Sequence, residues 1–153
     1  MRFSLTIPTT LATRWQAASD TRLVTAGMAI RYGALVPLPD DPQSWMEATL
    51  RADAAGDVAL GGVSEQATAK GWPMRLIGAR VVAGTSLVEV RLGAFYKFFE
   101  YGAAAVAYAG GPAPADELAR EALEIFATAE PDWSAEVVAV HQLWEGVESW
   151  RMK

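Results

Sequence analysis

The 153-residue sequence contains no cysteine and only one histidine, His141. The lack of cysteine excludes disulfides, thiolate metal ligands and cysteine nucleophiles. A single histidine also excludes a two-histidine metal site within one chain, so we expect no metal centre. Val137, Val140 and Trp144 share the predicted helical face of His141, which favours a structural role for it. A serine nucleophile activated by His141 stays open, although no Gly-x-Ser-x-Gly motif is present.

Clusters of positive charge and long apolar runs are also missing. The 13 lysines and arginines are scattered and the net charge is -5, whereas nucleic-acid binding needs clustered cations, so we predict no nucleic-acid partner. No apolar run approaches the roughly 18 residues of a membrane span. The amino-terminal pattern ends at Pro8 and lacks the continuous apolar region of a signal peptide. We therefore expect a soluble, cytoplasmic protein with no integral membrane segment.

Recognisable catalytic motifs are equally scarce. Gly61-Gly62 and Gly110-Gly111-Pro112 lack the spaced glycines of a phosphate-binding loop, and we interpret them as turns. Glu65, Glu89 and Glu100 fall on predicted strands or turns, but the sequence does not show that any two converge as acid and base. We therefore assign no catalytic residue and expect no cofactor.

Apolar residues, in contrast, are plentiful. The sequence is 52% hydrophobic and 20% charged, far from the composition of a disordered chain. A chain of this length buries roughly 68 to 70% of its unfolded surface when it folds. We expect a single domain over residues 1–153, with residues 134–153 as a C-terminal helical extension of that domain.

The order of periodic segments predicts the fold class. Asp41 and Pro42 resemble a helix start, and Trp45, Met46 and Leu50 follow at helical spacing. Short turns between the strand-like segments favour antiparallel pairing. Strands followed by helices predict an α+β fold: a single antiparallel sheet of about five to seven strands with helices packed on it. The expected strands are 2–8, 58–63, 65–69, 74–82 and the two strands of the hairpin 87–108, with one or two further strands within 23–38. The expected helices are 42–56, 118–126 and 137–147.

The hairpin 87–108 carries the most informative pattern. Val90, Ala94 and Tyr96 alternate onto one face, while charged residues and phenyl rings alternate onto the other. We interpret the second face as an exposed surface for another protein, because aromatic side chains are enriched at interfaces. The alternative is that the third helix covers those rings within the chain. The predicted protein-binding residues are Glu89, Arg91, Phe95, Phe99, Tyr101 and Trp72.

Several of these features together resemble a known family. They are the proline-terminated opening strand (Ile7-Pro8) with Trp15 soon after, a helix near residue 45, the turn from Thr68 to Pro73, the strand ending Phe95-Tyr96-Lys97-Phe98-Phe99, and a helix before Pro131-Asp132-Trp133. The sequence resembles the PsbP-like superfamily, and its DcrB-related branch in size. The resemblance implies a PsbP-like sheet backed by helices that serves as a non-catalytic binding platform. DcrB-related members include cytoplasmic chaperones that shield transmembrane segments of type VI secretion effectors.

We therefore expect a non-enzymatic adaptor or chaperone that holds an apolar segment of a partner protein on an aromatic sheet face. The partner is another protein, or a second copy of this chain. Two alternatives remain at this point. One is a small hydrolase or isomerase that uses acidic residues in a pocket, and the other is a self-assembling structural subunit.

Overall fold

The computed structural model describes residues 2–110 and 115–132 of the chain. The predicted helix 137–147 and the extension 134–153 lie outside these residues. The elements follow in the order β1 (Arg2–Ser4), β2 (Gln16–Ser19), β3 (Arg22–Thr25), β4 (Met28–Tyr32), β5 (Val36–Pro37), α1 (Pro42–Arg51), β6 (Asp57–Ala67), β7 (Pro73–Ala83), β8 (Ser86–Phe98), β9 (Tyr101–Gly110), α2 (Ala115–Phe126) and β10 (Glu130–Asp132).

The main sheet has eight strands, all in antiparallel pairs. Its order is β2-β3-β4-β9-β8-β7-β6, and β5 pairs with β9 beyond the end of β4. This confirms the α+β class and the antiparallel sheet. The expected size of five to seven strands in a single sheet was wrong, because the sheet is larger and β1 pairs with β10 in a separate two-stranded sheet. Gln16–Ser19 is exposed throughout, so β2 has no apolar alternation to reveal it.

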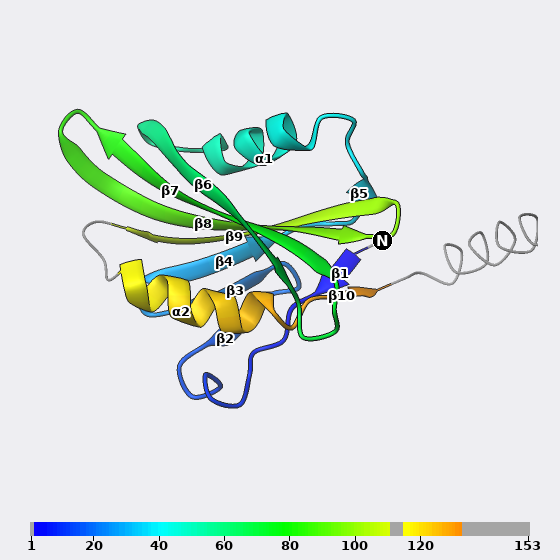
Figure 1. Cartoon of the computed structure of the whole chain (residues 1–153). Coiled ribbons are helices and arrows are strands. Elements are labelled where there is room, and N and C mark those ends of the chain that lie inside the picture. Colours follow the sequence, from blue (N-terminus) through cyan, green and yellow to red (C-terminus); the bar gives the residue numbers. More distant parts are fainter. Residues whose placement is uncertain (1, 111–114, 133–153) are drawn as a thin grey trace, which may run out of the picture.

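The two helices lie on opposite faces of the main sheet, as Figure 1 shows. They also cover different parts of it. Side chains of α1 pack against β6, β7 and β8, whereas α2 packs against β4, β8 and β9. We refer to the two sides as the α1 face and the α2 face. Strand β8 lies beneath both helices, so its two sets of alternating side chains are both buried over Val90–Tyr96, and α1 also reaches Ala104 and Val106 on β9.

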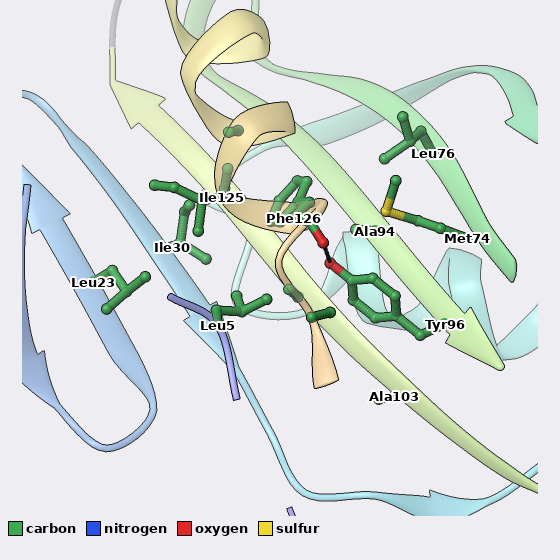
Figure 2. Close-up of a cluster of buried hydrophobic side chains, with 14 of the residues drawn as sticks. Leu5, Leu23, Ile30, Met74, Leu76, Ala94, Tyr96, Ala103, Ile125 and Phe126 are labelled. Carbon is green, nitrogen blue, oxygen red and sulfur yellow. Dashed lines mark hydrogen bonds between the residues drawn. The ribbon is translucent and has the colours of Figure 1, made fainter. Parts of the chain in front are cut away.

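The larger core lies between α2 and the sheet (Figure 2). Strand β9 presents small side chains to α2, which lets the helix lie close to the sheet. The hydroxyl of Tyr96 donates a hydrogen bond of 2.9 Å to the carbonyl of Phe126, in the last turn of α2. Burial raises the pKa of Tyr96 well above its ordinary value, so the hydroxyl stays a donor. The small residues of β9 on this face are Ala103, Ala105, Ala107 and Ala109.

The smaller core lies beneath α1 and joins Met46 and Leu50 to Ile77 and Phe95. Gly93 permits this close packing. A Cβ atom at Gly93 would lie 2.7 Å from the ring of Phe95 and 2.9 Å from Leu50, nearer than such atoms approach in proteins. The position therefore needs glycine because the helix lies directly over it.

Helix α1 begins as the sequence predicts. Asp41 is the N-cap, and its carboxylate accepts hydrogen bonds from the backbone N–H of Ser44 at 3.2 Å and from the hydroxyl of Ser44 at 2.6 Å. Pro42 occupies the first turn, where no intrahelical donor is needed. The hydrogen bonds from Ser44 lower the pKa of Asp41 from its ordinary value of 3.8.

Replacing Asp41 with alanine should therefore destabilise the protein in a pH-dependent way. A carboxyl group whose pKa is lower in the folded state contributes stability above its unfolded pKa, and this stability is lost as the pH falls through the folded pKa. Urea denaturation should show the largest difference between wild type and D41A at pH 7, shrinking below about pH 3.8. The control D40A removes the neighbouring carboxylate but keeps the cap. An equal, pH-independent loss in both variants would contradict the capping role.

Candidate functional site

The structure separates the six predicted binding residues into three places: beneath α1, at the carboxyl end of α1, and at the end of β8, where the β6–β7 turn contacts it. Phe95 lies beneath α1 and is only 4% exposed. Its ring meets the Trp45 ring edge-on, with the centroids 5.3 Å apart. The expectation that Phe95 is exposed was therefore wrong. The mixed charged and aromatic pattern reflects a face covered by a helix of the same chain rather than a free surface.

Glu89 and Arg91 form a polar anchor for the carboxyl end of α1. Arg91 is 9% exposed and donates from Nη1 to the carbonyls of Leu50 at 3.0 Å and Ala52 at 2.7 Å. A longer contact of 3.4 Å joins its Nη2 to the carbonyl of Asp53, and its Nε pairs with Glu89. The last carbonyls of a helix have no intrahelical partner and carry partial negative charge, so a buried guanidinium satisfies both needs.

Trp72, Phe99 and Tyr101 lie at the far end of β8, roughly 26 Å from Arg91 by the rise of the strand. Trp72 is half-buried, and its ring meets the rings of Phe98 and Phe99 edge-on at 5.2 Å. Phe99 is 61% exposed and has a left-handed backbone with φ of 57°. These residues form an aromatic corner at the hairpin tip, separate from Arg91 and Glu89.

A large hollow lies on the α1 face, beside the helix. It has a volume of about 770 Å³ and lies between α1 and strands β3, β4 and β9. Glu89 and Arg91 border it, so this part of the predicted site does reach a hollow. We call it the arginine groove, and define it by Arg22, Arg31, Val36, Trp45, Val106 and Tyr108.

The groove combines an apolar floor with charged walls. Val106 and Trp45 are half-buried, and Val36 is 37% exposed at one end. Arg31 is the direct cross-strand partner of Val106, and its guanidinium lies over the ring of Tyr108, 5.5 Å from the centroid. Apolar surface flanked by polar groups is the usual composition of a protein-binding groove.

Sequence reasoning missed Arg22, Arg31 and Val106 as site residues. One signal could have found the two arginines. Thr25 pairs with Met28 around the two-residue turn Ala26-Gly27, where Gly27 has φ of 75°. Such a turn fixes the register of a hairpin, and counting back three residues on each side pairs Arg22 with Arg31.

The described part of the chain shows no group of three or more acidic or histidine side chains placed to hold a metal ion. Within the same residues, neither helix has the length and hydropathy needed to cross a bilayer. No protein-family model matches the sequence, and no curated protein matches it. The resemblance to the PsbP-like superfamily therefore stays a prediction.

Replacing Arg91 with methionine should weaken the attachment of α1. The variant keeps the buried aliphatic stem but leaves the carbonyls of Leu50 and Ala52 without their donor. We expect a loss of about 2–4 kcal/mol in the free energy of unfolding, measured with urea. The control R75M removes an arginine whose 3.3 Å pair with Glu65 is half-exposed, and should cost at most about 1 kcal/mol. Equal stabilities of R91M and R75M would contradict the anchor.

Proposed function

We propose that this protein is a non-enzymatic adaptor or chaperone that holds an apolar segment of another protein in the arginine groove. The observation that carries the proposal is an open groove with an apolar floor on the same sheet face as Glu89, Arg91 and Phe95. The site moves from the predicted aromatic strand face to the area beside α1, because α1 occupies the position over Phe95.

The position of α1 supports a groove rather than an enclosed pocket. The helix covers β6, β7 and β8, and among the described residues no element covers β3 and β4 on this side. A peptide segment can therefore lie along the helix with one side on the sheet. Helix-in-groove recognition uses such a surface, in which apolar side chains at helical spacing enter the groove.

The acidic residues at the groove give less support to the hydrolytic alternative. Glu89 pairs with Arg91, and Asp53 lies 3.7 Å from Arg31. Each carboxylate faces a guanidinium of the same chain. The resemblance to the DcrB-related branch adds a narrower proposal: the bound segment is a transmembrane stretch of a secretion effector, shielded in the cytoplasm before export.

Binding of an uncharged apolar peptide tests the proposed function. The probe is a fluorescein-labelled 16-residue peptide of leucine, alanine and glutamine, and its binding is followed by fluorescence anisotropy. Because V36Q/V106Q makes the floor polar, it should weaken binding about tenfold. The control V63Q changes a valine that is 45% exposed on β6, outside the groove, and should bind as wild type does.

Two results would contradict the proposed function. One is a wild-type protein that does not bind the peptide at any concentration where the peptide stays monomeric. The other is V36Q/V106Q binding as tightly as wild type, which would place the contact elsewhere, with the aromatic corner formed by Trp72, Phe99 and Tyr101 as the next surface to alter.

A further inference from the structure

Two arginines lie directly opposite each other at the rim of the arginine groove. Arg22 on β3 and Arg31 on β4 are cross-strand partners, and both line the groove. Directly opposed residues in antiparallel strands have Cβ atoms roughly 4.5 to 5.5 Å apart, and like charges in this position are destabilising. An anion between the two guanidinium groups would offset the repulsion.

The chain's own carboxylate at this place does not saturate the pair. Asp53 approaches Arg31 at 3.7 Å, near the outer limit of an ion pair, and its side chain is 83% exposed. A guanidinium offers five N–H donors in a planar fork that fits a carboxylate with two parallel hydrogen bonds. The ring of Tyr108 beneath Arg31 restrains the orientation of that fork. The rim therefore retains donors for an incoming carboxylate.

The arginines and the apolar floor belong to one row across the sheet. Arg22 pairs with Arg31, and Arg31 pairs with Val106 on β9. A ligand that places an acid on the arginines therefore has its neighbouring atoms over Val106 and beside Trp45. Because the two arginines lie next to Val106 in this row, the site suits a carboxylate that is attached to an apolar chain.

We propose that the arginine groove selects a peptide segment in which a glutamate or aspartate accompanies apolar residues. The acid binds Arg22 and Arg31, and the apolar side chains rest on Val36, Trp45 and Val106. This inference rests on the proposed function and adds the chemistry of the partner. A peptide fits better than a fatty acid, because β3 and β4 have no described cover on this face and small ligands need sites that bury most of their surface.

The wild-type protein and three labelled peptides provide the first test. The uncharged 16-residue peptide is compared with versions in which two neighbouring glutamines near one end become two glutamates or two lysines. At 50 mM NaCl the glutamate peptide should bind about tenfold more tightly than the glutamine peptide, and the lysine peptide more weakly than both. At 500 mM NaCl the advantage of glutamate should shrink, since salt screens exposed charges.

Variants then test whether the two arginines cause the preference for glutamate. R22Q/R31Q should reduce the preference for the glutamate peptide over the glutamine peptide from about tenfold to within about twofold. The control R80Q/R120Q removes the same charge from exposed positions outside the groove and should keep the tenfold preference. Circular dichroism checks that each variant folds. The comparison of the three peptides on the wild-type protein does not depend on the folding of any variant.

The outcomes separate this inference from the proposed function. Equal binding of the glutamate and glutamine peptides, both lost in V36Q/V106Q, would overturn the acid preference and leave the groove as the binding site. No binding of any peptide to wild type would overturn both. If laurate displaces the glutamine peptide while glutamate gives no advantage, the arginines serve a fatty acid and the proposed peptide chemistry is wrong.

Discussion

The structure depends on strand β8, which holds a helix on each of its two faces. On one face the buried guanidinium of Arg91 donates to the carbonyls of Leu50 and Ala52 at the end of α1. On the other, the hydroxyl of Tyr96 donates to the carbonyl of Phe126 at the end of α2. Both contacts satisfy carbonyls that a helix cannot pair internally. A carbonyl buried without a donor is costly, so these bonds fix where each helix ends on the sheet.

The arginine groove follows from the position of α1. The helix is anchored at Arg91 and packed on Phe95, with Gly93 allowing the close approach. It therefore covers β6, β7 and β8 and reaches Ala104 and Val106 on β9, while the groove between α1 and strands β3 and β4 stays open. The binding surface proposed here is thus the part of this sheet face that lies beside α1 rather than beneath it.

Local chemistry made much of the fold predictable. Asp41 and Pro42 marked the start of α1, the apolar stripe around Leu118 and Ile125 marked α2, and the alternation in β8 marked a strand. The short strands were harder. Gln16–Ser19 is exposed, and Glu130–Asp132 contains a proline, so neither carries an apolar alternation. Strand β10 also pairs with β1 near the other end of the chain, a contact that periodicity does not encode.

The candidate site was less predictable, because the residues on the second face of β8 have two physical explanations. Phe95 and Arg91 suit either an exposed recognition surface or the underside of a helix, and the sequence pattern is the same in both cases. The placement of α1 decides between the two explanations. It depends on tertiary contacts between residues about 40 positions apart, such as Leu50 and Arg91. The groove residues Arg22 and Val106 are farther apart still in the sequence, so no local motif joins them.

Hydrogen–deuterium exchange of the unliganded protein tests most directly whether α1 is a fixed wall of the groove. If Arg91 and Phe95 hold the helix on the sheet, the amides of residues 46–51 should exchange as slowly as those of β8 around Phe95. Exchange of those α1 amides within seconds, while β8 stays protected, would show that the helix opens independently. That result would contradict the account, because α1 would then not form a fixed wall of the groove.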